Sequence, residues 1–553
     1  MDVNLRIAGE AGQGVDTTGR VLTGAFAALG LHVLASQNYM SRIRGGLNWF
    51  DVRIGDIELF SSRKQTELLV ALTSEALEKL RGDVAEGGIV LFNGGAADGA
   101  VAVELEKVAK QVGGSPIMAN TVAAGAVFGL LGYELDALAA QVTETLGGKG
   151  AEVLQANLAC ARKGYELGNA SGRGLKAPGP AGAPSAVYSG SEAVGLAAAT
   201  AGVKFVTAYP MSPSTAAFTY LAGIADEYGI LIQQAEDEIS AINMICGAVY
   251  GGVPAMTTTS GGGFALMTEG LSLAGVAELP VVIMVAQRPG PATGLPTHTA
   301  QEDLLFVLHA GHGEFPRAVF APGTPEQAYA LTRRAFEVAH RYRTPAIILT
   351  DQYLADMLKN SSPLDASTRP IDRCLVEKPA PGYLSYRVTD SGVSPRALPG
   401  SGAIVVADSH EHTEDGHITE DPDVRVRMVD KRRRKLDGMR AEAVPPELYG
   451  PKRAGHLLIC WGSTYGPARE AADMLGGSTA VLHFAQPWPF DATAARRAIE
   501  SVGAGRVTCV ESNATGQFAS LLRSSGALDE AELMLRYDSW PFTAEDIAAR
   551  CAS

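Results

Sequence analysis

Between residues 188 and 375, short apolar runs recur at regular intervals and are separated by stretches with helical periodicity. The runs are KFVTAYP, GILIQQAE, PAMTTTS, LPVVIMVAQ, RAVFAPG and PAIILTD. Strands made of continuous apolar residues are typical of a parallel sheet that is covered on both faces. This segment is therefore predicted to be an α/β domain with a parallel sheet.

The segments on either side alternate strand and helix as well, so three α/β domains are expected. Residues 1–170 and 451–553 form the two outer domains. Residues 171–187 are predicted to be a linker, because Gly, Pro, Ala and Ser replace any hydrophobic period there. Residues 376–450 are rich in Pro and weakly patterned, which predicts a connecting extension. Its charge run from Lys431 to Lys435 is expected to be a solvated helix face.

Length and charge narrow the classes of function. The chain has 553 residues, of which 46% are hydrophobic, and at about 150 residues per domain this excludes a single compact domain. A net charge of −14 opposes binding to nucleic acid. No apolar run approaches the roughly 20 residues that span a bilayer, so no membrane association is expected. Because no basic and apolar leader begins the sequence, we expect a cytoplasmic protein.

The cysteines are spread too widely to form a site by themselves. No two of them have a ligand spacing such as C-x-x-C. We therefore expect no metal, no iron–sulfur cluster and no disulfide in this chain. The six residues are Cys160, Cys246, Cys374, Cys460, Cys509 and Cys551.

Four turns that follow strands of the central domain carry candidate chemistry. They lie at residues 210–215, 236–238, 260–263 and 288–291. Taken singly, each has the composition of an ordinary helix cap or tight turn. Ligands of open parallel sheets bind at the carboxyl ends of the strands, where these turns would meet. Together they would place hydroxyls, a carboxylate, bare backbone and a guanidinium at one edge, which suits an anionic small molecule.

The same turns carry a family resemblance. AYPMSPST resembles the YPITPS signature of the 2-oxoacid:ferredoxin oxidoreductases, and QAEDEISAINM, TTTSGGGFALMTEGLSLAG, QRPGPATGLPT and EHTEDGHITEDPDVRVRMVDKR follow in the family's order. GEAGQGVDTTGRVL and SRIRGGLNWFDVRIGD look like its gamma domain, also described as the pyruvate/ketoisovalerate oxidoreductase catalytic domain. WGSTYGPAREA and ESNATGQFASLLR look like its transketolase-C-terminal-like domain. The resemblance covers essentially the whole chain and implies an alpha subunit of the 2-oxoglutarate type with a fused gamma domain.

The resemblance implies an activity and a set of residues. The family uses thiamine diphosphate to decarboxylate a 2-oxoacid, reduces ferredoxin and forms an acyl-CoA, reversibly in principle and typically in anaerobic metabolism. Glu238 aligns with the carboxylate at N1′ of the aminopyrimidine, which favours the imino tautomer that removes the C2 proton. Arg288 has the fork geometry to hold the substrate carboxylate, although pairing with a neighbouring acid is the structural alternative. Thr297 and Ser212 are the candidate hydroxyl donors. The remaining cofactor candidates are Tyr209, Pro210, Ser212, Ser260, Gly261 and Gly262.

Departures from the family pattern bear on substrate and partners. Ser212 replaces the usual threonine, and His298 stands where relatives often have arginine. Pyruvate-type members differ at GPATGLPT, which favours a larger 2-oxoacid, either 2-oxoglutarate or a branched-chain or broader set. The family's Gly-Asp-Gly motif, which holds the diphosphate through Mg²⁺, is absent. Mg²⁺ and a [4Fe–4S] cluster are therefore expected on a separate beta subunit, in a heterodimer or heterotetramer that reduces ferredoxin.

Two further motifs leave alternatives open. Gly12, Gln13 and Gly14 follow a strand and open a helix, a geometry that can cradle phosphate, and with Arg44 they are candidates for binding CoA. The spacing is not G-x-G-x-x-G, and HVLASQNY lacks the acid that a nucleotide-dependent dehydrogenase would need. The histidines of SHEHTEDGH have ligand-like density but are expected to make polar contacts. A non-catalytic scaffold of an electron-transfer complex remains the rival to an enzyme. The histidine group comprises His410, His412 and His417, with Glu414 and Asp415 beside them.

Overall fold

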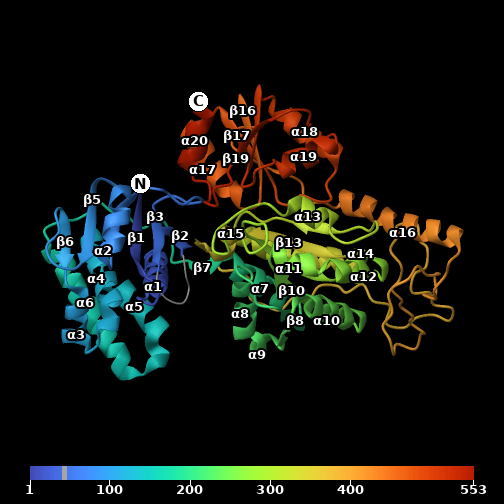
Figure 1. The fold of residues 1–553 in the computed structure, drawn as a ribbon, viewed down its shortest axis with the longest axis horizontal. Helices are drawn as coiled ribbons and strands as arrows, with labels where there is room; N and C mark the ends of the chain where they lie inside the picture. Colours follow the sequence, from blue (N-terminus) through green and yellow to red (C-terminus); the bar gives the residue numbers. More distant parts are fainter. Residues whose placement is uncertain (40–45, 553) are drawn as a thin grey trace. The chain divides into compact units, whose positions relative to one another are not determined.

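The computed structural model describes residues 1–39 and 46–552, which form two compact units (Figure 1). The first unit comprises Met1–Ser189 with two short later segments, Met357–Pro363 and Thr543–Asp546. The second unit comprises Gly190–Asp356, Leu364–Phe542 and the residues that follow Asp546. Each unit has its own sheets and core, and the α/β class predicted from the sequence is confirmed.

The first unit is built on an eight-stranded mixed sheet of order β6-β5-β4-β1-β3-β2-β14-β7. The central strand β1 pairs with β4 in parallel and with β3 antiparallel. The strands are β1 Asp2–Glu10, β2 His32–Asn38, β3 Leu47–Gly55, β4 Thr66–Ala71, β5 Val84–Asn93, β6 Ala100–Val103, β7 Ala186–Ser189 and β14 Leu358–Ser361. The sequence places β14 in the central domain, but its backbone pairs with β2 and β7, so the first unit includes a strand from far along the chain.

Helices α4 and α6 of this unit lie side by side (Figure 1). A Cβ at Gly125 of α4 would overlap the Ala161 carbonyl, and a Cβ at Gly164 of α6 would overlap the Val122 carbonyl. Glycines on both helices therefore allow the two backbones to approach closely. The helices of this unit are α1 Val15–Ala28, α2 Ser74–Leu80, α3 Leu105–Gly113, α4 Ala119–Leu131, α5 Leu135–Leu146 and α6 Ala151–Ala170.

No single helix in the described ranges is long and apolar enough to cross a membrane. One pair of helical segments, Leu105–Gly113 and Pro116–Leu131, passes the length and composition test only when taken together, and it is bent by 118°.

The second unit contains the parallel sheet predicted from the apolar runs. Its order is β12-β13-β11-β10-β8-β9, and every pairing is parallel. The chain adds β9 on one side of β8 and β10 on the other, so the topological switch point lies between β8 and β10. Every residue of β10, β11 and β13 is buried, as the continuous apolar runs require. The strands are β8 Phe205–Ala208, β9 Leu231–Gln234, β10 Ala255–Thr259, β11 Val282–Gln287, β12 Ala318–Phe320 and β13 Ala346–Asp351.

Helices separate these strands. They are α7 Gly190–Thr200, α8 Thr215–Gly223, α9 Ala225–Tyr228, α10 Glu238–Tyr250, α11 Gly261–Leu266, α12 Thr268–Val276, α13 Leu304–His309, α14 Pro325–Tyr342 and α15 Gln352–Asp356.

A five-stranded sheet of order β15-β17-β16-β18-β19 completes the second unit. Gln301 joins this sheet to the parallel sheet, because its side chain donates to the Trp461 carbonyl at 2.8 Å and accepts from the Ser512 N–H at 3.0 Å. The elements are β15 Glu447–Tyr449, β16 His456–Trp461, α17 Tyr465–Leu475, β17 Thr479–Phe484, α18 Ala492–Val502, β18 Arg506–Glu511, α19 Gln517–Ser524 and β19 Glu532–Leu535. The last helix, α20 Ala544–Ala552, begins in the segment Thr543–Asp546 of the first unit and ends in the second.

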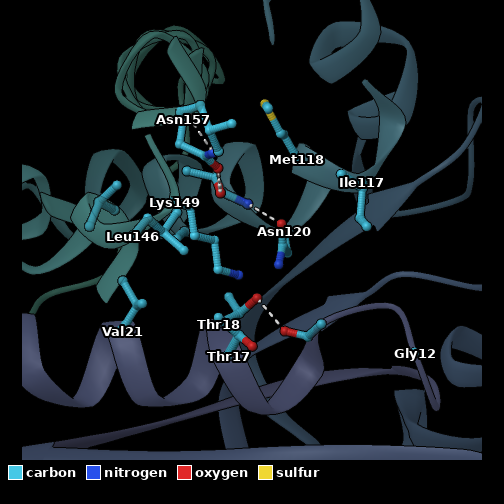
Figure 2. Close-up of a pocket in the computed structure, with 15 residues that line it drawn as sticks. Gly12, Thr17, Thr18, Val21, Ile117, Met118, Asn120, Leu146, Lys149 and Asn157 are labelled. Atoms are coloured by element: carbon cyan, nitrogen blue, oxygen red, sulfur yellow. Dashed lines mark hydrogen bonds between the residues drawn. The ribbon is translucent and has the colours of Figure 1, made fainter. Parts of the chain in front are cut away.

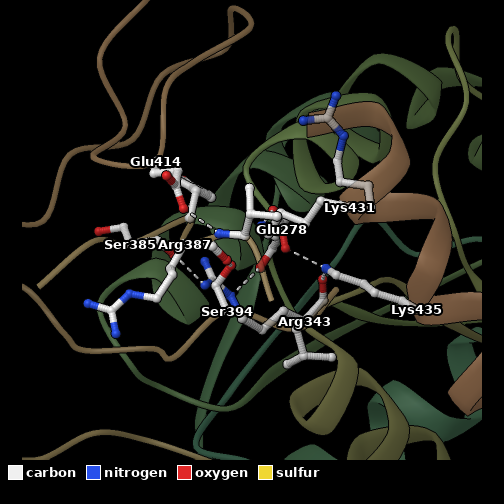
Figure 3. A network of polar contacts seen from close by, with 12 residues as sticks. Glu278, Arg343, Ser385, Arg387, Ser394, Glu414, Lys431 and Lys435 are labelled. Atoms are coloured by element: carbon white, nitrogen blue, oxygen red, sulfur yellow. Dashed lines mark hydrogen bonds and ion pairs between the residues drawn. The ribbon is translucent and has the colours of Figure 1, made fainter. Parts of the chain in front are cut away.

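Helix α16, Pro422–Ala441, corrects one expectation from the sequence. Most of the charge run is not a solvated face, because the side chains of Lys431 and Lys435 are 0% and 1% exposed and Arg432 is buried with them, whereas Arg433 is exposed. Both lysines pair with the buried carboxylate of Glu278, Lys435 at 2.5 Å (Figure 3). Burial opposes the charge of Glu278, but Lys435, Lys431 and Arg343 together hold the pKa of its carboxyl far below its usual range.

Candidate active site

The carboxyl edge of the parallel sheet brings the turns singled out from the sequence to the topological switch point. The turn after β8 begins at Tyr209, which is exposed, and the turn after β10 begins at Ser260, which is fully buried. Strands β8 and β10 are neighbours, so these two turns flank the crevice where open α/β sheets bind ligands. The candidate site is therefore at this edge.

Glu238 is the first residue of α10 and is only 2% exposed. The preceding residue, Asp237, caps the helix by accepting from the Ser240 N–H at 2.7 Å, and this hydrogen bond lowers the pKa of Asp237. The Glu238 carboxylate is thus not used as the cap. Its Oε1 is buried without a hydrogen-bond partner in the described part of the chain. A buried carboxylate oxygen without a donor is costly, and a ligand N–H would satisfy it.

The glycines of the 260–263 turn make room for two carboxylates. A Cβ at Gly263 would overlap the Glu238 carboxylate and the Thr259 hydroxyl, and a Cβ at Gly261 would overlap the carboxylate of Asp303. Three hydroxyls beside this turn are also buried without a partner among the described residues. They belong to Thr257, Thr258 and Ser260. The turn is therefore a place where backbone, hydroxyls and acids converge at close range.

Arg288 follows β11 and is half-buried. Its Nη1 donates to the Ser212 carbonyl at 2.7 Å, which joins the turns after β8 and β11. Burial lowers the pKa of the guanidinium. Within residues 1–39 and 46–552, Arg288 forms no ion pair with an acid. The alternative role considered from the sequence, pairing with a neighbouring Asp or Glu, is therefore absent from these residues. The remaining N–H groups of Arg288 are available to an anionic ligand.

Other candidates around this edge are less closely connected. Thr297 is half-buried, and no hydrogen bond in the described ranges links it to Arg288 or Ser212. The ring of His298 packs edge-on against Trp540 with centroids 5.1 Å apart, and burial lowers the pKa of this histidine. Pro210 is exposed.

Two acids at this edge were not singled out from the sequence. Asp303 directly precedes α13, a position where Asp is a common helix cap. Burial and the charge of Glu302 raise the pKa of its carboxyl to about 6. Asp351 ends β13, and burial also raises the pKa of this carboxyl to about 6, against hydrogen bonds from the Leu354 N–H and the Ser463 hydroxyl. Asp351 ends the apolar run PAIILTD, and its place at a strand end could have singled it out, whereas no local pattern distinguishes Asp303 from a surface residue.

The N-terminal unit holds a separate cavity of about 360 Å³ (Figure 2). Gly12 and Gly14 line it, whereas the Gln13 side chain accepts from the Glu10 N–H at 2.8 Å and shapes the turn. Arg44 lies outside the described residues. Lys149, which the sequence did not single out, extends its ammonium group into the cavity near Thr18 and Asn120. The cavity therefore combines a glycine turn, a cation and polar side chains.

The histidine cluster makes local contacts. His412 is buried against the Tyr386 ring, with centroids 4.0 Å apart, and its Nδ1 lies 3.1 Å from the His410 carbonyl. His410 pairs with Asp408, and His417 lies 3.2 Å from Asp415. The described residues contain no group of three or more His, Cys, Asp or Glu side chains placed to hold a metal ion.

Comparison with known proteins agrees with this geometry. Residues 196–431 match the family model for pyruvate flavodoxin/ferredoxin oxidoreductase, thiamine diphosphate-binding, and residues 4–167 match that for pyruvate ferredoxin/flavodoxin oxidoreductase. These matches define the class as an α/β oxidoreductase with a thiamine diphosphate-binding domain.

Similarity over the full length is more specific. The chain is 30% identical to the alpha subunit of 2-oxoacid:ferredoxin oxidoreductase 2 of Aeropyrum pernix, over 99% of this chain and 97% of the relative. It is 29% identical to the 2-oxoglutarate oxidoreductase subunit KorA of Mycobacterium tuberculosis, over 96% and 88%. The 2-oxoglutarate:ferredoxin oxidoreductase of Magnetococcus marinus, solved with 2-oxoglutarate, coenzyme A and succinyl-CoA bound, superposes with a TM-score of 0.91 at 29% identity, over 100% of this chain and 99% of that one. The chain belongs to the 2-oxoacid:ferredoxin oxidoreductases, as an alpha subunit.

Proposed function

We propose that this alpha subunit, together with a beta subunit, catalyses the CoA-dependent oxidative decarboxylation of 2-oxoglutarate to succinyl-CoA with reduction of ferredoxin. The observation that carries the proposal is the buried Glu238 carboxylate, whose Oε1 lacks a donor at the switch point of a thiamine diphosphate-binding domain. The names of the M. tuberculosis and M. marinus relatives support 2-oxoglutarate as the substrate.

The donor set fits the aminopyrimidine of thiamine diphosphate. Thiamine diphosphate, when bound, would supply a thiazolium ring that takes up the electron pair released when the bond to the substrate carboxylate breaks. Glu238 Oε1 accepts a hydrogen bond from N1′ and so holds the ring in the tautomer that can take up a proton. The Ser260 hydroxyl and the turn at Gly261 and Gly262, which follow β10, would hold the ring together with Tyr209 and Pro210, which follow β8. The low exposure of Glu238 strengthens its hydrogen bond by excluding water.

Arg288 holds the carboxylate of the 2-oxoacid. Its Nη1 is fixed on the Ser212 carbonyl, so the guanidinium is oriented before substrate binds. The free N–H groups form charge-assisted hydrogen bonds to the carboxylate, and the hydroxyls of Ser212 and Thr297 add neutral ones. The Arg288 guanidinium lowers the activation barrier only if it also places the carbonyl carbon of the substrate next to the cofactor.

CoA binds in the cavity of the N-terminal unit. Backbone N–H groups at Gly12 and Gly14, at the start of α1, suit phosphate oxygens, and Lys149 adds a positive charge. The M. marinus enzyme was solved with coenzyme A bound, which supports CoA as the ligand of this chain.

The partner beta subunit holds Mg²⁺, the diphosphate and a [4Fe–4S] cluster that passes electrons to ferredoxin. This follows from a sequence without Gly-Asp-Gly and without clustered cysteines. The test is to purify the chain alone and together with the beta subunit that co-purifies with it, and to assay 2-oxoglutarate-dependent reduction of ferredoxin. The proposal is supported if the two-subunit complex is active and the single chain is not. It is contradicted if the single chain binds iron in a stoichiometric amount.

A further inference from the structure

Helix α16 is strongly basic in an acidic protein. Its 20 residues carry eight Lys or Arg and three Asp, whereas the whole chain has a net charge of −14. Five of these eight cations pair with acids, one of them Arg440 with Asp437 of the same helix. Lys431 and Lys435 pair with Glu278, and Arg425 and Arg432 pair with Glu411.

Three arginines of the helix are left over. Arg427, Arg433 and Arg434 form no ion pair or hydrogen bond with the part of the chain that the structure describes. The Nε of Arg434 is buried without an acceptor among those residues. Arg427 and Arg433 are exposed to solvent, but a buried N–H without an acceptor is costly, and an anion at Arg434 would satisfy it.

The three arginines line one cavity of about 500 Å³. Arg440, Asp430 and Asp437 also line it, and Arg440 lies 3.4 Å from Asp437. Four guanidinium groups against two carboxylates leave two positive charges in excess. Guanidinium groups suit phosphoryl oxygens because each presents paired N–H donors.

A second cavity of about 320 Å³ adjoins the first, since Arg433 and Leu436 line both. Its other walls include Phe315, Trp488 and Leu521. Aromatic and aliphatic side chains of this kind stack on the flat face of a nucleobase. The first cavity is thus cationic, and the second adds two aromatic rings, one of which, Phe315, has the Arg317 guanidinium 4.4 Å from its centroid.

The helix that carries the site is firmly held. The Glu278 carboxylate is fully buried and pairs with Lys431 and Lys435, while Lys435 also donates to the Arg343 carbonyl at 3.0 Å (Figure 3). Breaking such a buried pair is expensive, so the backbone of α16 that carries the outer arginines is held in place.

We propose that α16 carries a binding site for a nucleoside polyphosphate, with the phosphoryl groups on Arg427, Arg433 and Arg434 and the base against Trp488 and Phe315. This site lies in the second unit and is separate from the residues of the switch point and from the cavity at Gly12.

The test is calorimetric titration of the purified alpha–beta complex with ATP, with adenosine and inorganic tripolyphosphate as fragments of the same ligand. The three α16 arginines do not line the N-terminal cavity, so any ATP that binds there binds equally to wild type and to the α16 variant. Wild type should bind ATP with a Kd below about 1 mM and each fragment at least about tenfold more weakly. Replacing all three arginines by Gln should weaken ATP binding by about a hundredfold or more, because each lost charge-assisted hydrogen bond costs about tenfold.

A matched triple variant, Arg20→Gln, Arg496→Gln and Arg506→Gln, removes the same charge from surface ion pairs elsewhere and should bind ATP as wild type does. Trp488→Phe should keep the affinity within about threefold but lose the change in tryptophan fluorescence on ATP binding. The proposal is overturned if wild type takes up no ATP, if the α16 variant binds like the matched control, or if tripolyphosphate binds as tightly as ATP.

Discussion

The Glu238 carboxylate occupies the space that a side chain at Gly263 would fill. The first turn of α11 therefore has to be glycine where it faces this acid, and the Thr259 hydroxyl lies in the same space. The arrangement holds Glu238 at the strand edge while leaving its Oε1 without a donor. Glycine here serves close approach, and the geometry of the acid depends on it.

We expect Gly263→Ala to reduce activity by about a hundredfold, because the new methyl group displaces the Glu238 carboxylate and small displacements of catalytic groups are costly. Gly247→Ala, on the open side of α10, is the matched control, since a Cβ there meets nothing within 4 Å. Steady-state kinetics and circular dichroism of both variants check this. Equal activity of the two would mean that the position of Glu238 does not depend on Gly263.

Arg288→Lys should lower kcat/KM for 2-oxoglutarate roughly ten- to a hundredfold, because an ammonium group cannot reproduce a bidentate fork. Thiamine diphosphate affinity should be largely unchanged, since the diphosphate is assigned to the partner. Arg496→Lys, in a surface ion pair with Asp529, is the control. Kinetics with 2-oxoglutarate, pyruvate and a branched-chain 2-oxoacid are compared with a cofactor titration. A loss that lies wholly in cofactor binding would return Arg288 to a structural role.

Lys149→Gln should raise the KM for CoA by about tenfold and leave the KM for 2-oxoglutarate unchanged, because only the CoA phosphates meet this ammonium group. Lys110→Gln changes an exposed lysine of the same unit and should alter neither constant. If the KM for CoA is the same in both variants, the cavity at Gly12 is not the CoA site.

The stability of the second unit should depend on pH through Asp303. Burial raises the pKa of this carboxyl from 3.8 to about 6 in the folded state, so the folded protein binds the proton more tightly than the unfolded chain. The group therefore opposes folding above about pH 6, and this cost disappears as the pH falls toward 4. We expect Asp303→Asn to melt above wild type near pH 8, with the difference narrowing toward about pH 5.

Thermal melts across this range test the Asp303 prediction. Asp226→Asn, at an exposed position of α9, is the control and should show the pH dependence of wild type. A melting difference between Asp303→Asn and wild type that stays constant with pH would contradict the argument.

The sequence predicts the parallel sheet and its chemically loaded edge because both depend on local patterns. The continuous apolar run of β11 and the Arg288 that follows it are adjacent in the chain. Features that depend on distant partners were not predicted. The burial of Lys431 requires the carboxylate of Glu278, 153 residues away. The roles of Asp303 and Lys149 likewise depend on tertiary surroundings that no local spacing encodes.

The most direct test of the account concerns Glu238 itself. Deuterium exchange at C2 of thiamine diphosphate is measured in the assembled complex for wild type, Glu238→Gln and Glu236→Gln, the last at an exposed position two residues earlier. If the Glu238 carboxylate accepts the hydrogen bond from N1′, Glu238→Gln should slow exchange by about a hundredfold or more while the complex stays assembled, and Glu236→Gln should exchange at the wild-type rate. Equal exchange rates in the two variants would contradict the assignment of Glu238 to the cofactor.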